Sequence, residues 1–583
     1  MTIDDTDLRK LVRKIALLNA VKHDGKAQVG PVIGKILGEK AELRNKVKEA
    51  TALVSSVLRE INSLPLDEQK RIVEAEWPEA LVKEKVEEEK RLPSLPNVEK
   101  YPMIVTRFSP NPDCVIHLGS ARAIILCYEY AKMYHGKFIV RFEDTDPKVK
   151  RPVLAFYDRI REDLAWLGCK PDEEYIQSDR IPLYYEFAEK MLADGNAYVC
   201  TCDSEVFRKR ILQNKPCGCR NQPPEEHLAR WQRMLAGGYE QGEVVVRVKT
   251  DLNHPNPAVR DWPALRLIDI EKYPHPRVGT KYRVWPLYNL ACGVDDHLMG
   301  VSHIIRGKEH LTNQVRQEYM YRHLGWKYPD AIHYGRLKIT GAILSKSKIV
   351  QGMREGLYND WDDPRLATFA ALRRRGFLPA AIKKMIIDIG PKTSDVTLSW
   401  ENLNAYNRKL LDPTSDRYFF VQEPIELTVK DIPRKFTVSL RLHPQHPERG
   451  SREYMIAPEG KAGLARFWVA RRDVDASKIN TTIRLMELFN INIKKANVYS
   501  AEASFTSESY EDARKTKAQL IHWVPIGEDV PCNIVMPDAT VVEGIAEKAC
   551  LRLKPGDIIQ FERFGFVRID RGNGKIVAYY SQK

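Results

Sequence analysis

Residues 103–146 read MIVTRFSPNPDCVIHLGSARAIILCYEYAKMYHGKFIVRFEDTD, and this stretch decides the fold of the chain. A short β-branched run at 103–108 comes before an apolar segment with helical spacing, and a second β-branched run begins at residue 137. The His135–Gly136 pair ends the helix between them. Because parallel strands need such a helical crossover, the sequence predicts a Rossmann-like, doubly wound α/β domain.

The loop between the first strand and the helix carries His117 and Gly119. Such a loop lies at the carboxyl edge of a parallel sheet, where ligands bind, and helix N-terminal amides favour phosphate there. Gly119 allows a nucleotide to approach the backbone closely, and His117 can donate a hydrogen bond as charge develops on a phosphate. An ordinary helix start is the alternative, and the local pattern alone favours it.

A second candidate phosphate-binding segment is GRLKITGAILSKSKIV at 335–350, in which Lys346 stands between Ser345 and Ser347. Lysines on a mobile loop suit the negative charge that develops during phosphoryl chemistry. A solvated basic loop is the plainer interpretation of this segment taken by itself.

Four of the ten cysteines are grouped as two Cys-x-Cys pairs, Cys200 with Cys202 and Cys217 with Cys219. Four thiolates in two close pairs can form a tetrahedral structural zinc site, which we favour over four buried or redox thiols. Four protein ligands leave no open coordination position, so such a zinc ion would shape its domain and would not catalyse.

Taken together, the His-x-Gly helix start and the later Leu-Ser-Lys-Ser segment resemble the paired signatures of class I aminoacyl-tRNA synthetases. The segments TRFSPNPDCVIHLGSARA, VRFEDTDP and VSHIIRGKEHL further resemble glutamyl-tRNA synthetases. The β-rich C-terminal third and the helical N-terminal arm resemble the archaeal branch of that family. The resemblance departs from the usual signatures at Ser120, where a second histidine is typical, and near Ala342 or Ile343, where a first lysine is typical.

The resemblance implies roles for residues at two adjoining sites. The ATP-binding residues would be Pro110, His117, Gly119, Ser120, Glu309, Ser345, Lys346 and Ser347, with His117 and Lys346 as the catalytic pair. The glutamate-binding residues would be Arg107, Ser109, Glu143, Tyr288 and Arg306, with Glu143 on the amino group. Arginine suits bidentate recognition of a carboxylate. Structural ion pairs at the two arginines and core packing at Tyr288 are the plainer alternatives. The segment DDHLMG at 295–300 can be a structural turn, although the resemblance places it at the border of the site.

The implied reaction has two steps and uses ATP with Mg²⁺. The α-carboxylate of L-glutamate attacks the α-phosphate to give glutamyl-adenylate, and the 2′-hydroxyl of the terminal adenosine of tRNA(Glu) then takes the glutamyl group. The resemblance also implies that tRNA is needed before activation. The protein would act mainly by positioning and charge stabilisation. The alternative interpretations are a glutaminyl-tRNA synthetase and a non-catalytic RNA-binding relative. The sequence does not decide whether the enzyme also charges tRNA(Gln) with glutamate.

The remaining sequence suggests the domain order and the partners. Lys and Arg outnumber Asp and Glu by 92 to 78, and this net charge of +14 agrees with a nucleic-acid partner. A basic proteome or simple solubility explains the charge equally well. No apolar run is long enough for a membrane span, so we expect a cytoplasmic protein, and a monomer. We expect basic helices near 373–375 and the C-terminal β-barrels to contact tRNA.

The expected domains are a helical N-terminal domain with linker (1–100), a first catalytic half (101–197), an acceptor-stem insertion (198–282), a second catalytic half (283–350), a helical stem-contact domain (351–411) and anticodon-binding β-barrels (412–583).

Overall fold

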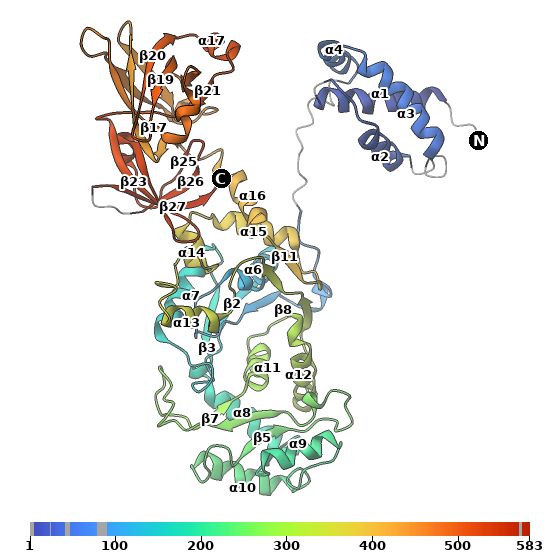
Figure 1. The fold of residues 1–583 in the computed structure, drawn as a ribbon. Coiled ribbons are helices and arrows are strands. Elements are labelled where there is room, and N and C mark those ends of the chain that lie inside the picture. The colour runs from blue at the N-terminus through green and yellow to red at the C-terminus, as the bar shows by residue number, and fades with distance from the viewer. Residues whose placement is uncertain (1–4, 24, 41–42, 44–46, 78–89, 571–573) are drawn as a thin grey trace. The chain divides into compact units, whose positions relative to one another are not determined.

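A computed structural model describes residues 5–23, 25–40, 43, 47–77, 90–570 and 574–583. The chain forms two compact units, residues 1–90 and 91–583, each with its own hydrophobic core (Figure 1). Part of the linker predicted up to residue 100, residues 78–89, lies outside the described residues.

The first unit consists of helices α1 (Asp5–Lys22), α2 (Val29–Glu39), α3 (Val47–Asn62) and α4 (Leu66–Glu76), as the helical sequence pattern predicts. Val12, Val32, Val54 and Val73 bring one buried side chain from each helix into a shared core. The buried amide of Gln69 donates hydrogen bonds to three backbone carbonyl groups and so fixes the turns around α4.

The second unit is built on parallel strands. Strands β1 (Val105–Phe108), β2 (Lys137–Phe142) and β3 (Glu173–Ile176) pair in parallel, as do β8 (His303–Gly307) and β9 (Asp330–Tyr334). Ser302 joins the two sets, because its backbone N–H donates to Val105 and its hydroxyl accepts from the Val105 N–H. The strands therefore lie in the order β3-β2-β1-β8-β9.

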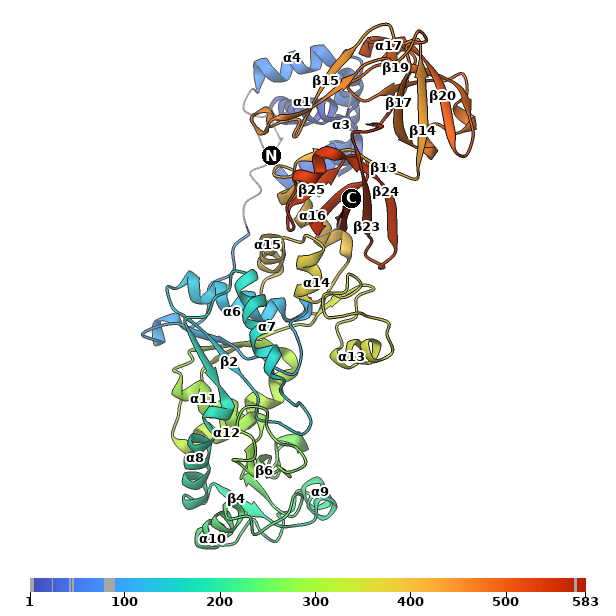
Figure 2. The same ribbon diagram turned by 90° about the vertical axis from the view of Figure 1, so that its left-hand side faces the viewer.

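Helices cover both faces of this sheet, so the predicted doubly wound fold is confirmed. Phe138 and Val140 of β2 pack in the core shared with α6 (Ala121–Met133) and α7 (Leu154–Trp166). Ile139 points to the opposite face, whose cluster includes Ile304 and Met299. Helices α11 (Tyr288–Leu298) and α12 (Leu311–Leu324) lie on that side (Figure 2).

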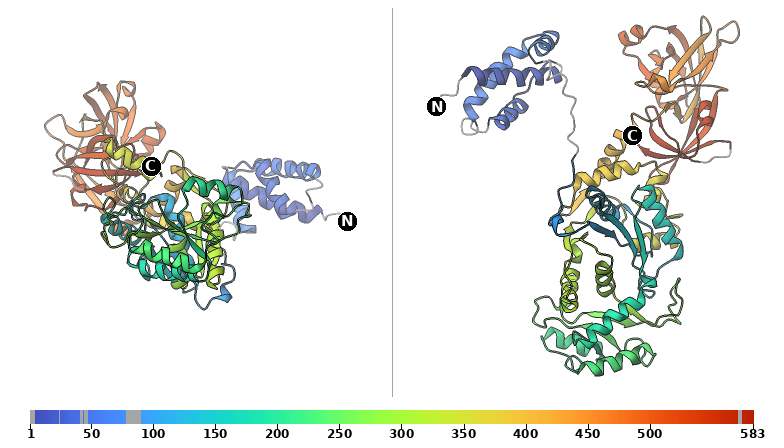
Figure 3. Two further views of the ribbon diagram at one scale, coloured as in Figure 1. Left: turned by 90° about the horizontal axis from the view of Figure 1, so that it is seen from below. Right: turned by 180° about the vertical axis from the view of Figure 1, so that it is seen from behind.

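An antiparallel sheet is inserted between the two halves of the parallel sheet. Its strands, in spatial order, are β4 (Ala197–Cys200), β5 (Val245–Val248), β6 (Pro263–Leu267) and β7 (Val284–Pro286). Helices α8 (Ile181–Ala193), α9 (Ser204–Leu212) and α10 (Pro224–Leu235) accompany it (Figure 3). Of the grouped cysteines, Cys200 ends β4 and Cys202 follows it, whereas Cys217 and Cys219 lie after α9.

Short helices connect the catalytic sheet to the C-terminal strands. They are α13 (Lys346–Arg354), α14 (Phe369–Arg374), α15 (Pro379–Ile389) and α16 (Trp400–Leu411), with a parallel pair formed by β10 (Leu337–Ile339) and β11 (Val396–Leu398).

The C-terminal region contains two seven-stranded sheets, and the two edge strands of each sheet are neighbours in the chain. The edge strands of the first sheet, β12 and β13, are consecutive in the chain and separated only by Phe419. The edge strands of the second, β21 and β22, are separated only by His522 and Trp523. Sheets whose two edges are consecutive in the chain are curled toward closure, so the predicted β-barrels are present.

The first barrel sheet runs in spatial order β12 (Arg417–Tyr418), β25 (Ile558–Phe561), β26 (Gly565–Asp570), β27 (Ile576–Gln582), β23 (Asp529–Val535), β24 (Val541–Glu547) and β13 (Phe420–Gln422). The second runs β21 (Gln519–Ile521), β18 (Thr482–Leu485), β19 (Asn490–Ala496), β20 (Ser500–Ser507), β14 (Pro424–Lys430), β17 (Ala465–Ala470) and β22 (Val524–Pro525). A separate hairpin pairs β15 (Phe436–Arg441) with β16 (Ser451–Ile456). Among the helices of the described residues, none has the length and hydropathy needed to cross a bilayer.

Candidate functional site

A cavity of about 700 Å³ opens at the carboxyl ends of the parallel strands. Arg107 enters it from β1, Glu143 from the end of β2, Arg306 from β8, and Tyr288 is the first residue of α11. Ser109, the fifth residue predicted to bind glutamate, also lines it. Residues far apart in the sequence meet here because the carboxyl ends of parallel strands share one edge of the sheet. Glu309, predicted to bind ATP, lines the same cavity.

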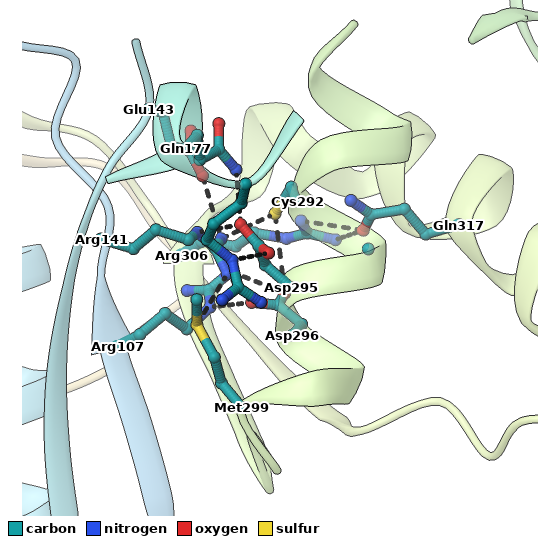
Figure 4. A network of polar contacts seen from close by, with 12 residues as sticks. Arg107, Arg141, Glu143, Gln177, Cys292, Asp295, Asp296, Met299, Arg306 and Gln317 are labelled. Carbon is teal, nitrogen blue, oxygen red and sulfur yellow. Dashed lines mark hydrogen bonds and ion pairs between the residues drawn. The ribbon is translucent and has the colours of Figure 1, made fainter. Parts of the chain in front are cut away.

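Asp296 of α11 fixes two arginines behind the cavity (Figure 4). Arg107 donates to both carboxylate oxygens, at 3.0 and 3.3 Å, and Arg141 donates to Oδ1 at 2.7 Å. All three side chains are buried. Burial alone would raise the pKa of Asp296, but the two guanidinium groups lower it to about 2. Asp296 therefore stays ionised and holds Arg107 in one orientation.

Charges in the rest of this network are balanced. Arg141 also donates to Glu143 at 3.0 Å, which aims that carboxylate at the cavity. Asp295 accepts hydrogen bonds from Arg180 at 2.8 Å and from Tyr184 at 2.7 Å. Three guanidinium groups thus face three carboxylates, which offsets the cost of burying these charges.

Arg306 lies outside this balance. Its guanidinium donates to the neutral Oε1 of Gln317, at 3.2 Å from both terminal nitrogens, and to the hydroxyl of Tyr328 at 2.9 Å. Its Nε has no hydrogen-bond partner within the described residues, although the side chain is only 5% exposed. The cavity therefore contains a buried cation that an anionic ligand would neutralise.

His117 is held in place by a second part of the chain. It forms an antiparallel bridge with Thr368, and flanking hydrogen bonds join Leu118 to Ala367 at 2.8 Å and Phe369 to Ile116 at 3.1 Å. The imidazole Nδ1 is buried with no partner within the described residues, and burial lowers the pKa of His117. A neutral ring with one free nitrogen is suited to a polar ligand.

Residue 119 is a glycine in part because the ring of His117 leaves little space for a side chain there. A Cβ at Gly119 would lie 2.8 Å from Cε1 and 2.9 Å from Nδ1 of the His117 ring, and 3.6 Å from Leu344. The sequence predicts a glycine here so that a nucleotide can approach the backbone, and packing within the chain is a second reason for it. Because Leu344 belongs to the lysine loop, that loop lies beside the start of α6.

Lys346 begins α13, and its Nζ lies 2.5 Å from the carboxylate of Asp113, in the loop that leads to His117. The structure therefore brings the two signature segments together. It does not bring them to the cavity wall, because Pro110, His117, Gly119, Ser120 and 345–347 are absent from the residues lining that cavity. The Pro110 carbonyl nevertheless accepts a hydrogen bond from the Glu143 N–H at 2.9 Å, which ties the signature loop to β2.

The four grouped cysteines converge at the end of β4. The Sγ atoms of Cys200 and Cys217 are 3.8 Å apart, and those of Cys202 and Cys219 are 3.7 Å apart. The Sγ atoms of Cys200, Cys202 and Cys219 all lie within 4.8 Å of one another. A tetrahedral zinc ion with Zn–S bonds of about 2.3 Å separates its sulfur ligands by about 3.8 Å. The two pair distances match this spacing and Cys217 lies outside the group of three, so the cluster is a candidate metal site.

Sequence reasoning assigned no role to Arg141 and Gln317, which support the cavity. The segment at 295–300, which the resemblance placed at the border of the site, contains the end of α11 and the two buried aspartates Asp295 and Asp296, whose individual contacts were not predicted. One signal was present in the sequence, because two adjacent acids in the apolar run YNLACGVDDHL imply buried charges that need partners.

The sequence matches known families along most of its length. The family model for the catalytic domain of class I tRNA synthetases (E and Q) matches residues 103–413. Two models for anti-codon binding domains of the same group match residues 415–507 and 520–570. The chain belongs to the class I tRNA synthetases of the E and Q group.

Several curated relatives are similar over the whole chain. A glutamate--tRNA ligase of Pyrococcus furiosus is 52% identical, with 99% of this chain and 100% of the relative covered. The glutamate--tRNA ligase of Pyrococcus abyssi is 53% identical with the same coverage. The solved structure of a glutamate tRNA ligase from Elizabethkingia meningosepticum is more distant, with 21% identity, a TM-score of 0.39, and coverage of 54% of this chain and 70% of that chain.

Proposed function

We propose that the protein is a glutamate--tRNA ligase. It joins L-glutamate to tRNA(Glu) in two steps, through glutamyl-adenylate, at the expense of ATP. Family membership and the full-length similarity to glutamate--tRNA ligases support this activity over the glutaminyl and the non-catalytic alternatives.

The observation that carries the choice of amino acid is the unbalanced charge of Arg306. Arg107 is neutralised by Asp296, whereas Arg306 has only neutral partners and faces the cavity. The γ-carboxylate of glutamate supplies the missing negative charge, and glutamine does not. The carboxylate of Glu143, which Arg141 orients, binds the positively charged α-amino group of glutamate. The contact between the guanidinium of Arg306 and the γ-carboxylate is charge-assisted, and charge-assisted hydrogen bonds are among the strong ones in proteins.

The phosphate chemistry is assigned to the neighbouring segments. His117 offers a neutral imidazole with a free nitrogen, and Lys346 supplies a cation on the adjoining loop. ATP lies between them, so its α-phosphate faces the α-carboxylate of glutamate in the cavity. Class I synthetases use Mg²⁺ with ATP, which neutralises charge on the phosphates. The chain contributes mainly position and charge, because no covalent bond to the protein is needed.

Zinc and RNA contacts complete the proposal. Cys200, Cys202, Cys217 and Cys219 would hold one structural zinc ion that fixes the loops around β4. The inserted domain then presents an ordered surface to the acceptor end of the tRNA. The two C-terminal barrels would bind the anticodon, in agreement with the family models that match them.

A pyrophosphate exchange assay tests the function directly. The protein is incubated with ATP and labelled pyrophosphate, with glutamate or with glutamine, in the presence and absence of tRNA(Glu). We expect exchange with glutamate that depends on tRNA. Exchange with glutamine would favour the glutaminyl rival, and no exchange with either amino acid would favour the non-catalytic rival.

A further inference from the structure

A second cavity, of about 610 Å³, lies between the start of α16 and the C-terminal strand β27. It shares no lining residue with the substrate cavity. Four cationic side chains line it, against one carboxylate from Glu401; they are Arg365, Arg375, Arg408 and Lys583. Arg365 is paired with Asp363 at 2.7 Å, so the excess positive charge comes from the other three. A hollow with this excess of positive charge favours an anion.

Arg375 is the residue that makes this cavity unusual. The side chain is 5% exposed, and its only hydrogen bond to the described residues is donated to the carbonyl of Ser581 at 3.3 Å. Its Nε has no hydrogen-bond partner among the described residues. Burial lowers the pKa of Arg375 to about 10. Its cation also lies over the rings of Phe377 and Trp400, at 5.1 and 5.0 Å. Ring faces attract a cation but do not neutralise its charge.

The two preceding arginines show the contrast. Arg373 approaches the Asp163 carboxylate at 3.9 Å, and Arg374 donates to Asp362 at 2.9 Å. Both therefore have an acid within the protein, whereas Arg375, the most buried of the three, faces a cavity. Leaving a buried cation without a counter-ion is costly, so a bound anion would stabilise this site.

Gln582 provides a second directed donor. Its Oε1 accepts a hydrogen bond from Asn407 at 3.3 Å, which leaves the Nε2 group to donate elsewhere. Nε2 is buried and has no partner among the described residues, and Gln582 lines the same cavity. Arg408 and Lys583 are exposed, so they can attract an anion from solvent. Trp400 and Tyr580 also line the cavity and offer aromatic surface to a nucleoside attached to that anion.

We infer that this cavity binds a phosphate group between Arg375 and Gln582, and that the phosphate belongs to the backbone of the bound tRNA. The inference rests on the proposed function, which makes tRNA the polyanion that the protein must hold. Free phosphate or pyrophosphate has the same chemistry, and the experiment below separates these sources.

The test compares the salt dependence of tRNA binding in the full-length protein and its variants. The dissociation constant for a tRNA(Glu) transcript is measured between low and physiological salt for wild type, Arg375→Gln and Arg408→Gln. Each lost phosphate contact lowers the slope of log K against log salt by about 0.7–0.9. We expect that decrease in both variants, together with roughly tenfold weaker binding at low salt for Arg375→Gln.

The matched control is Lys409→Gln, which removes the same charge from the next residue of α16 but does not line the cavity. It should leave the slope nearly unchanged. If Arg375→Gln fails to fold, as judged by its thermal midpoint, Arg408→Gln at the exposed rim still decides the question.

A second measurement distinguishes the sources of phosphate. The thermal midpoints of wild type and Arg408→Gln are compared with inorganic phosphate and then pyrophosphate, without tRNA. If phosphate or pyrophosphate raises the thermal midpoint of wild type alone, and the variants bind tRNA with the salt slope of wild type, the site binds a free phosphate and not the tRNA backbone. If the slopes are unchanged and neither anion raises the midpoint, the phosphate site is overturned. Wild-type aminoacylation with glutamate is measured in parallel, so a failure of the proposed function is seen separately.

Discussion

Asp296 on α11 and Arg107 on β1 form a buried ion pair with two hydrogen bonds, and Arg141 shares the same carboxylate. The cavity at the carboxyl ends of the parallel strands is therefore supported by one acid that orients two cations. Because Asp296 lies on a helix packed against the sheet, it fixes the side chains of Arg107 on β1 and Arg141 on β2.

Asp296→Asn should weaken both the fold and glutamate binding. The substitution keeps the shape but leaves the buried guanidinium of Arg107 with a neutral partner, while Arg141 keeps Glu143; removing one partner of a buried pair typically costs about 3–5 kcal/mol. Urea unfolding measures the stability, and steady-state kinetics measure KM for glutamate, which we expect to rise about tenfold or more as Arg107 loses its orientation. The control is Asp158→Asn, which breaks an exposed pair with Arg161. Surface pairs contribute about 0–1 kcal/mol, so a similar loss there would contradict the argument.

Asp163 on α7 should make the protein less stable as the pH rises. Burial raises the pKa of Asp163 from 3.8 to about 7, and Arg373 offsets only part of this effect. Between these values the folded state holds a proton that the unfolded state has released, so the free energy of unfolding falls by up to about 1.4 kcal/mol per pH unit. Asp163→Asn should remove this slope, as measured by urea unfolding from pH 4 to 7. A slope of the same size in the variant would exclude Asp163 as its source.

Thr368 links the position of His117 to the start of α14. Its hydroxyl accepts the N–H of Ala371 as a helix cap, while its backbone bridges His117. Thr368→Ala should cost about 1 kcal/mol of stability and should also slow adenylate formation, with KM for glutamate nearly unchanged. The control is Ser399→Ala, which removes the comparable cap of α16. If both variants slowed adenylate formation equally, the effect would come from general destabilisation and not from the bridge.

The sequence was sufficient for features that depend on local patterns. The βαβ order and the C-terminal strands follow from apolar periodicity and turn residues. The gathering of Arg107, Ser109, Glu143, Tyr288 and Arg306 into one cavity agrees with the resemblance; their roles remain predictions.

Contacts between distant segments could not be predicted in the same way. The pairing of Asp296 with Arg107 and Arg141, and the contact of Lys346 with Asp113, depend on how separate elements pack. The basic run at 373–375 illustrates the limit: the pattern predicts contact with RNA, which stays a prediction, but it does not show that Arg373 and Arg374 lie beside carboxylates of the protein and that Arg375 is buried. The sequence shows which residues are charged, but it does not show which residue neutralises each charge in the folded protein.

Zinc content should depend on the grouped cysteines alone. We expect about one equivalent of zinc per chain by metal analysis of protein purified without chelator, and a large loss of zinc in Cys202→Ser. A matched substitution outside the cluster, Cys114→Ser, should retain the metal. The same loss of metal in both variants, or metal-free wild-type protein, would argue for four reduced thiols.

Lys346 should be released from Asp113 before it can act on ATP. The two side chains are 2.5 Å apart, so the carboxylate competes with phosphate for the same ammonium group. Lys346→Ala should slow adenylate formation by about a hundredfold, the usual effect of removing one donor to a developing charge, while tRNA binding changes little. Asp113→Asn should lower KM for ATP a few-fold, because the competing anion is gone. Single-turnover adenylate formation with tRNA present measures the rates, and Lys348→Ala, an exposed lysine of the same helix, is the control. Equal losses of tRNA binding and of adenylate formation in Lys346→Ala would show that the loop binds RNA and does not serve the phosphate chemistry.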